Sequence, residues 1–231
     1  MTHNFRRTFS RLGLAALVLA TVSLAGDARP ARATTPPFGP PFAGPPGPGA
    51  WFVGQWYGNT VWAHRNPYRS GQGLHFGVDF NARCGTPVLA IGDGTVFAVD
   101  GPYGAAPHNV VIAHADGLFS LYGHLLERAP LEPGQPVRAG DPIARSGDPD
   151  GPRCDIDPHL HLEIRRAEMR ETVNPVPLIA LDWRRATIGV RRTGLAFEHD
   201  LDNPGRWMTI ADQPDVAFGE PPLNDYPRAW P

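Results

Sequence analysis

The sequence predicts an all-β, or β-dominated, domain of antiparallel hairpin-linked strands in a two-layer, sandwich-like arrangement. Short apolar runs alternate with Gly, Pro and Asp-Gly turns from Trp51 onward, and few windows show the 3.6-residue apolar period of a helix. The 231 residues include 26 Gly and 27 Pro, a turn-rich composition, while the 42% hydrophobic content suffices for a buried core. We expect one domain with appendages and a groove that holds the functional site.

The charged residues exclude several classes of protein. All 21 basic residues are Arg, so the chain has no lysine for a P-loop, for a Schiff base with pyridoxal phosphate, or for attachment of a lipoyl or biotinyl group. This removes the carrier domains that short hairpins of this kind would otherwise suggest. The net charge of −2 argues against nucleic acid as a partner.

Residues 1–33 have the pattern of an export signal. Three Arg precede an apolar run over residues 12–25, and Ala31-Arg32-Ala33 is a small-x-small cleavage site. The Arg6-Arg7 pair resembles a twin-arginine signal, although the general export route also fits. A membrane anchor is the alternative, but about 14 apolar residues are fewer than the roughly 20 that span a bilayer. We expect a secreted, extracytoplasmic protein without stable membrane insertion once the signal is removed.

Three further segments follow the signal. Residues 34–50 are rich in Pro and Gly, which predicts an extended linker. Residues 51–180 contain the strand patterns and the motifs and form the predicted domain. Residues 181–231 are a C-terminal extension of unknown role with short strands expected at 187–190, 195–197 and 207–210. This extension is either a structural wrap over a sheet edge or an accessory binding hairpin.

Two Asp-Gly turns within the domain predict hairpins. Residues 87–91 and 95–99 flank one turn, and residues 110–114 and 118–122 flank the other. Two β-rich runs around an Asp-Gly turn are a strong short-range hairpin signal.

The segment HLHLEIR at 159–165 is the most informative strand. Side chains alternate between the two faces of a strand, so the three apolar residues share one face and His159 and His161 share the other. The two histidines lie about 6.6 Å apart along the strand, and both rings can therefore reach one site.

His75 and Asp79 form a second pattern, H-x-x-x-D. In a fully extended strand these residues would lie about 13 Å apart, too far to share a metal ion with bonds near 2 Å. The chain must bend between them, and Gly77 at the centre tolerates such a bend.

Further motifs follow one another along the chain. They are GLHFGVDF at 73–80, CGTPVLA at 84–90, GDGTV at 92–96, VIAH at 111–114, LYGHL at 121–125, GQPV at 134–137, GDPI at 140–143 and PHLHLE at 158–163. In this order they resemble the lysostaphin/LytM-type zinc metalloendopeptidases, which cut peptide cross-links in bacterial peptidoglycan. The resemblance extends over residues 73–178.

This resemblance implies His75, Asp79 and His161 as ligands of one Zn²⁺ per chain, and His159 and His124 as catalytic histidines that do not bind the metal. Three protein ligands leave a position for water, whose pKa zinc lowers toward about 7. His159 would take or relay the proton of that water. His124 would donate a hydrogen bond to the oxyanion or help to protonate the leaving amine.

Two residues near these histidines have weaker assignments. Tyr122 lies two residues before His124, which predicts that it faces the same way; it either assists the transition state or packs as an aromatic. His114 is either satisfied by hydrogen bonds or supports a ligand.

The segment 146–158 departs from the family pattern because it is longer and acidic. Its four Asp either attract an amino-bearing stem peptide or simply form a solvated loop. Cys84 and Cys154 each lie five residues from an implied site residue, Asp79 and His159. We therefore expect a Cys84–Cys154 disulfide in an oxidising compartment, with two free buried thiols as the alternative.

These observations predict a secreted, cell-wall-associated zinc metalloendopeptidase acting on peptide cross-links of peptidoglycan. Its partners would be stem or cross-bridge peptides, and we expect a monomer. The alternative is a non-catalytic cell-wall-binding or regulatory module on the same fold. Loss of a ligand or catalytic residue would favour that module, and all five are present.

Overall fold

The computed structural model describes residues 35–47, 49–58, 60, 63, 74–151, 153–187, 197–199 and 207–219. These residues belong to the unit that comprises residues 35–231, and the expected export signal at 1–33 lies outside them. No helix in the described ranges is both long and apolar enough to cross a bilayer.

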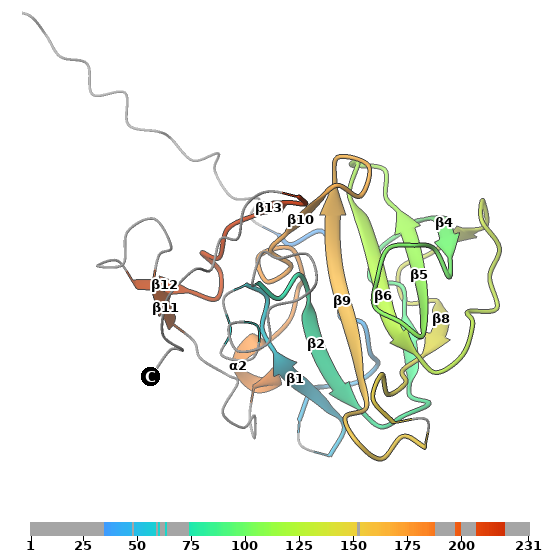
Figure 1. The fold of residues 1–231 in the computed structure, drawn as a ribbon, viewed down its shortest axis with the longest axis horizontal. Coiled ribbons are helices and arrows are strands. Elements are labelled where there is room, and N and C mark those ends of the chain that lie inside the picture. The colour runs from blue at the N-terminus through green and yellow to red at the C-terminus, as the bar shows by residue number, and fades with distance from the viewer. Residues whose placement is uncertain are drawn as a thin grey trace, which may run out of the picture. The chain divides into compact units, whose positions relative to one another are not determined.

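A nine-stranded antiparallel sheet dominates the described structure, which confirms the predicted β-dominated fold class (Figure 1). Its path runs β1-β2-β9-β6-β5-β4-β7, and β10 joins it by pairing with β9 and β13. Two smaller sheets pair β3 with β8 and β11 with β12, and every named strand pair is antiparallel. The strands are β1 (Trp51–Gln55), β2 (Val78–Ala82), β3 (Pro87–Leu89), β4 (Gly94–Val99), β5 (His108–Ala113), β6 (Phe119–Leu125), β7 (Pro136–Val137), β8 (Pro142–Arg145), β9 (His159–Arg166), β10 (Glu171–Val173), β11 (Phe197–His199), β12 (Trp207–Thr209) and β13 (Val216–Ala217).

Strand β9 organises the sheet. Along one edge it pairs with β6; along the other it pairs first with β2 and then with β10. Leu160, Leu162 and Ile164 are fully buried in the core, which confirms the predicted apolar face. The register places His161 between Asp79 of β2 and Gly123 of β6, so the opposite face brings two segments of the chain to one point.

One predicted hairpin is correct and the other is wrong. Strands β5 and β6 pair around the Asp116-Gly117 turn, as expected. Strand β3, in contrast, pairs with β8 rather than with β4, and β4 pairs with β5 and β7. At Gly92-Asp93-Gly94 the chain passes from the small sheet to the main sheet. Val88 of the small sheet and Val96 of the main sheet pack into the same hydrophobic core, which favours this arrangement.

The described part of the Pro/Gly-rich segment 34–50 is not an extended linker, which corrects the prediction. Phe38 and Phe42 are buried in the core at 4% and 1% exposure. The backbone of Phe38 exchanges hydrogen bonds with Leu178 and Ala180, and the Phe42 ring packs 5.7 Å from that of Trp51. The Pro and Gly content of this segment suggests a tether, but burial of its two Phe side chains stabilises it against the domain.

The described part of the C-terminal extension contains a short helix and wraps onto the sheet. Helix α2 (Trp183–Ala186) is capped by Asp182, and Trp183 packs against Trp56. Strands β11 and β12 form a hairpin, whereas the expected strand at 187–190 lies outside the described residues apart from Thr187, which is in a turn. Strand β13 adds to the edge of β10, which agrees with the structural-wrap interpretation for residues 207–219.

Candidate metal centre

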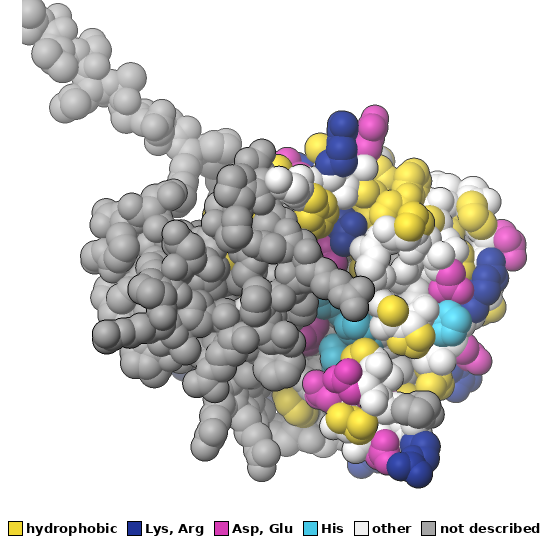
Figure 2. Space-filling model, viewed as in Figure 1, with side chains coloured by type: hydrophobic (Ala, Val, Ile, Leu, Met, Phe, Trp, Pro, Cys, Tyr) yellow, Lys and Arg dark blue, Asp and Glu magenta, His cyan; other side chains and the backbone are white. Residues whose placement is uncertain are grey.

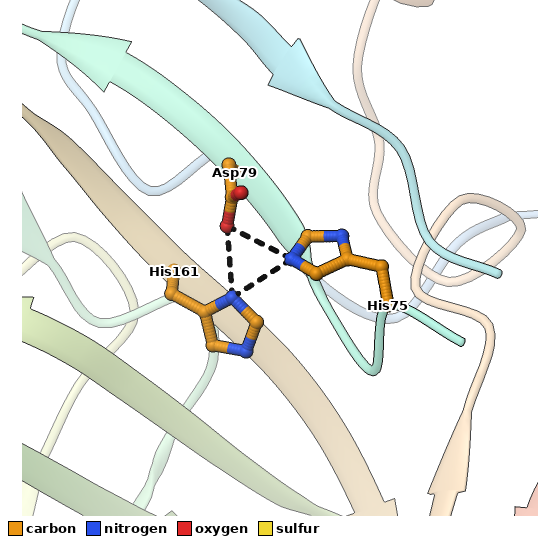
Figure 3. A group of neighbouring side chains, drawn as sticks. All are labelled: His75, Asp79 and His161. Carbon is orange, nitrogen blue, oxygen red and sulfur yellow. Dashed lines mark hydrogen bonds and ion pairs between the residues drawn. The ribbon is translucent and has the colours of Figure 1, made fainter. Parts of the chain in front are cut away.

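Three side chains converge on one point above β9 (Figure 3). His75 Nε2 lies 3.2 Å from Asp79 Oδ1 and 3.1 Å from His161 Nδ1, and His161 Nδ1 lies 2.8 Å from Asp79 Oδ1. All three residues are buried. Figure 2 shows histidine side chains beside acidic side chains on one face of the molecule.

The backbone brings His75 close to Asp79 by a bend, as the sequence required. His75 forms a two-hydrogen-bond β-bridge with Gly58, and the chain bends at Gly77 before β2 begins at Val78. Gly77 is needed for a second reason. A Cβ there would lie 2.6 Å from Leu162 O and 2.9 Å from two atoms of the His161 ring, distances that do not occur between real atoms of these kinds.

Hydrogen bonds to the backbone fix the tautomer of His75. Its Nδ1 lies 2.7 Å from the carbonyl oxygen of Trp56, which can only accept, so Nδ1 carries a proton. The Nε2 atom of the neutral ring therefore presents its lone pair to the cluster.

An ion pair on the same strand orients His161. Its Nε2 donates to Glu163 Oε1 at 3.0 Å, and Arg165 donates to both Glu163 oxygens, from Nε at 2.6 Å and from Nη2 at 3.0 Å. Arg165 Nη2 also donates to the carbonyl of Tyr103 at 2.8 Å. The alternation of β9 placed Glu163 and Arg165 on the histidine face, but the sequence alone assigned them no role.

The cluster attracts positive charge. Burial on its own would raise the pKa of Asp79, but His75, His159 and His161 lower it well below its ordinary value. Burial likewise disfavours a charged His161, yet the Asp79 and Glu163 carboxylates raise its pKa to about 9. A proton on His161 Nδ1 lies close to His75 Nε2 and Asp79 Oδ1. The same surroundings would stabilise a metal cation at this point.

The donor set fits zinc. Two imidazole nitrogens and a carboxylate oxygen are usual zinc ligands, and donors of a tetrahedral site with bonds of about 2.1 Å lie roughly 3.4 Å apart. The observed separations of 2.8 to 3.2 Å are slightly shorter and need only small side-chain rotations. The hydrogen bonds to Trp56 and Glu163 supply the outer partners that ligating histidines have in metal sites.

His159 and His124 stand beside the cluster. The Nε2 atom of His159 lies 3.8 Å from Asp79 Oδ1, and the His124 ring lies 4.9 Å from that of His159. The Nδ1 atoms donate to carbonyl oxygens, of Asp157 for His159 and of Ala106 for His124, so each neutral ring presents an Nε2 lone pair. Burial and the neighbouring histidines lower the pKa of His124 to about 4, which keeps that ring neutral.

Tyr122 does not face the site, which corrects the prediction from its spacing. It is fully buried on the core side, where its hydroxyl accepts from Ile91 N at 2.9 Å and burial raises its pKa to about 12. His124 reaches the opposite face because its φ of 56° is left-handed and breaks the strand alternation. The packed-aromatic alternative is therefore correct for Tyr122.

His114 is satisfied by hydrogen bonds away from the cluster. Its Nδ1 bonds to the Asp93 carbonyl and its Nε2 to Ser120 Oγ, both at 2.8 Å, and the Ser120 hydroxyl contacts that of Tyr122. Burial lowers the pKa of His114. It belongs to a buried polar network beneath the sheet rather than to the site.

Asp148 organises the acidic segment before β9. Its carboxylate accepts four backbone hydrogen bonds, from Asp150, Gly151, Ile156 and Asp157, at 2.9 to 3.1 Å. The other three aspartates of the segment are exposed. The sequence offered no signal that separated Asp148 from its acidic neighbours.

The predicted disulfide is present. Cys84 and Cys154 are bonded, with a Cα–Cα distance of 5.7 Å, and join the loop after β2 to the acidic segment. Backbone hydrogen bonds from Gly147 N to His124 O and from His159 N to Gly147 O connect the same segment to both outer histidines. The loop therefore positions His159 through its main chain.

Comparison with known proteins finds one family model that matches part of the chain. Residues 73–175 match the family model of Peptidase family M23. An uncharacterized metalloprotease of Haemophilus influenzae is 39% identical over 90 residues, which are 39% of this chain and 18% of that protein. The DD-carboxypeptidase/endopeptidase Mpg of Neisseria meningitidis is 39% identical over 103 residues, 45% of this chain and 22% of that protein. The chain thus spans about a fifth of the length of these relatives.

A solved structure is also similar. The catalytic domain of lysostaphin from Staphylococcus simulans is 28% identical, with a TM-score of 0.44, covering 55% of this chain and 90% of that one. The family match begins two residues before His75 and ends two residues after Val173, and it contains all five site residues. Residues 73–175 of this chain are therefore similar to Peptidase family M23.

Proposed function

We propose that this chain is a secreted zinc-dependent metalloendopeptidase that hydrolyses peptide cross-links of bacterial peptidoglycan. The observation that carries the proposal is the convergence of His75 Nε2, Asp79 Oδ1 and His161 Nδ1 with two further histidines beside them. The family match and the names of the two relatives support peptide hydrolysis. The pattern of an export signal at 1–33 supports an extracytoplasmic location, where peptidoglycan lies.

His75, Asp79 and His161 would hold the zinc ion. Zinc with three protein ligands supplies a Lewis acid and lowers the pKa of water toward about 7. The Trp56 carbonyl and the Glu163 carboxylate keep the two imidazoles oriented with the correct nitrogen toward the ion. Asp79 contributes a negative charge that partly neutralises the cation.

His159 is the residue placed to remove the proton of the attacking water. Its Nε2 lone pair points toward the cluster because Nδ1 is engaged with the Asp157 carbonyl. As the water oxygen bonds to the carbon of the scissile amide, the proton moves to Nε2. The resulting imidazolium can return it to the nitrogen of the departing amine when the C–N bond breaks, which balances the reaction.

His124 is the second histidine beside the cluster, and its ring lies next to those of His159 and His161. Its resting ring also presents an Nε2 lone pair, so it would donate to an oxyanion only after this nitrogen has taken the second proton of the attacking water, and the products are then a carboxylate and an ammonium group. The low pKa of His124 makes its protonated form a strong acid, suited to rapid transfer to the leaving amine. The two outer histidines therefore begin as bases and end as acids.

The test is digestion of purified peptidoglycan of several cross-link types, with released fragments identified by mass spectrometry. The purified protein should release peptide-cleaved fragments, lose activity with a chelator and recover with added zinc. His159→Ala should lose activity while His108→Ala, which removes a half-buried histidine paired with Asp100, should retain it. Zinc binding without cleavage of any cross-link would indicate the non-catalytic module, and activity unchanged by chelator and by His159→Ala would contradict the mechanism.

A further inference from the structure

The segment that contains β13 lies outside the family match and contacts the partners of the metal ligands. Strand β13 pairs with β10, and Phe218 N donates to Arg170 O at 2.9 Å (Figure 1). The segment is anchored by Tyr57, whose hydroxyl donates to Pro214 O at 2.7 Å, and by Asn174, whose side chain donates to Ile210 O at 2.8 Å.

Phe218 at the end of this segment covers Arg165. The guanidinium carbon of Arg165 lies 4.7 Å from the centroid of the Phe218 ring, within the range of a cation–π contact. The same ring packs edge-on at 5.1 Å against Phe76, the neighbour of His75. Phe218 therefore touches Phe76, the neighbour of His75, and Arg165, which donates to the hydrogen-bond acceptor of His161.

Arg165 is held by hydrogen bonds to two residues and by its contact with the Phe218 ring. It is only 6% exposed and makes three hydrogen bonds, two to Glu163 and one to the Tyr103 carbonyl. Because an ion pair is weakened by water and strengthened by a dry, fixed geometry, the aromatic cover decides how firmly Glu163 is held. Glu163 in turn is the acceptor that orients His161.

We infer that Phe218 is a positioning residue of the metal centre, acting through Arg165 and Glu163 on His161, so that the C-terminal extension is a functional part of the site. The expected effect on metal affinity rests on the proposed function, because it assumes that the site binds zinc. The restraint of the His161 ring by Phe218 does not depend on whether the chain is a peptidase.

The experiment follows the His161 Nε2–H proton by ¹H–¹⁵N NMR in the full chain labelled in its histidine rings, with and without zinc. His161→Gln identifies the signal. The proton that is bonded to Glu163 should exchange slowly with solvent in the wild type and in Phe218→Tyr. It should exchange at least 10-fold faster in Phe218→Ala and in Arg165→Gln. Phe52→Ala, which removes a half-buried aromatic ring from β1, is the matched control and should leave the signal unchanged.

Zinc affinity, measured by competition with a chromophoric chelator, should fall about 10-fold in Phe218→Ala and be restored by Phe218→Tyr, the range found for outer partners of metal ligands. The value of kcat should fall with little change in KM. Unchanged exchange of the His161 proton in Phe218→Ala would overturn the inference. If the wild type binds no zinc, the proposed function fails, while the exchange measurement still decides whether Phe218 restrains His161.

Discussion

Gly77, at the bend before β2, lies against the ring of His161 on β9. A methyl group at residue 77 would lie 2.9 Å from both Cε1 and Nε2 of that ring. The bend that brings His75 to Asp79 and the space that receives His161 therefore depend on the same glycine. One position without a side chain sets the geometry of all three donor atoms.

Gly77→Ala should damage the metal centre more than the fold. The added methyl must displace the His161 ring or the Leu162 carbonyl, at a cost of about 1–3 kcal/mol in the free energy of unfolding. We expect zinc affinity to fall by 10-fold or more, measured by chelator competition. Gly47→Ala, where the new methyl meets no atom within 4 Å, is the control. Wild-type zinc affinity in Gly77→Ala would show that His161 does not need this space.

Removal of either outer histidine should separate catalysis from metal binding. His159→Ala and His124→Ala should each lower kcat by roughly 10²–10⁴, because each loses a proton-transfer group, while one zinc per chain remains bound. Metal content by mass spectrometry and kcat on a peptide substrate measure the two quantities. Loss of zinc together with activity would instead make the affected histidine a ligand.

Asp148 should make the stability of the protein depend on pH at the acid end. Burial raises the pKa of this carboxyl, but the four backbone N–H groups outweigh burial and lower it below its ordinary value. The folded state therefore prefers the ionised form, so the contribution of Asp148 is fully present above its unfolded pKa of about 4 and is lost as the pH falls through the lower folded pKa.

Asp148→Asn should accordingly lower the free energy of unfolding by roughly 1–3 kcal/mol at pH 7 and by progressively less below pH 4. Denaturant titrations across that range measure the difference. Asp150→Asn, at an exposed aspartate of the same segment, is the control. A difference between Asp148→Asn and the wild type that stays constant down to pH 2 would refute this assignment.

The disulfide should support both stability and the position of His159. In the chain-entropy model, closing a loop of 70 residues contributes around 4 kcal/mol, and the bridge also anchors the segment that hydrogen-bonds to His159. Cys84→Ser with Cys154→Ser should lower the midpoint of urea unfolding and reduce kcat, with zinc still bound. An unchanged unfolding midpoint would show that the bridge adds nothing to the fold.

The sequence predicted features that depend on local periodicity. The alternation of β9 places Leu160 in the core and His161 on the site face, and the Asp116-Gly117 turn joins two paired strands. The bend at Gly77 followed from the spacing of His75 and Asp79 together with the expectation that they share one metal ion. In each case neighbours in the chain determine the outcome, so no knowledge of distant contacts was needed.

The errors arose where distant contacts decide. Strand β3 has the same local pattern whether its partner is β4 or β8, and only the shared core selects β8. Phe38 and Phe42 draw a Pro/Gly-rich segment into the core. The left-handed backbone of His124 turns its own side chain to the site face, whereas Tyr122 stays on the core face. The contacts of Arg165 with Phe218 and of Asp148 with its loop become visible only in three dimensions.

Zinc titration of the metal-free protein by calorimetry tests the central claim most directly. The wild type should bind one Zn²⁺ per chain, and Asp79→Ala and His161→Ala should each weaken binding by at least 100-fold, whereas Asp116→Ala in the β5–β6 turn should bind as the wild type does. Binding of zinc with equal affinity by Asp79→Ala and His161→Ala would contradict the claim that His75, Asp79 and His161 form the metal centre.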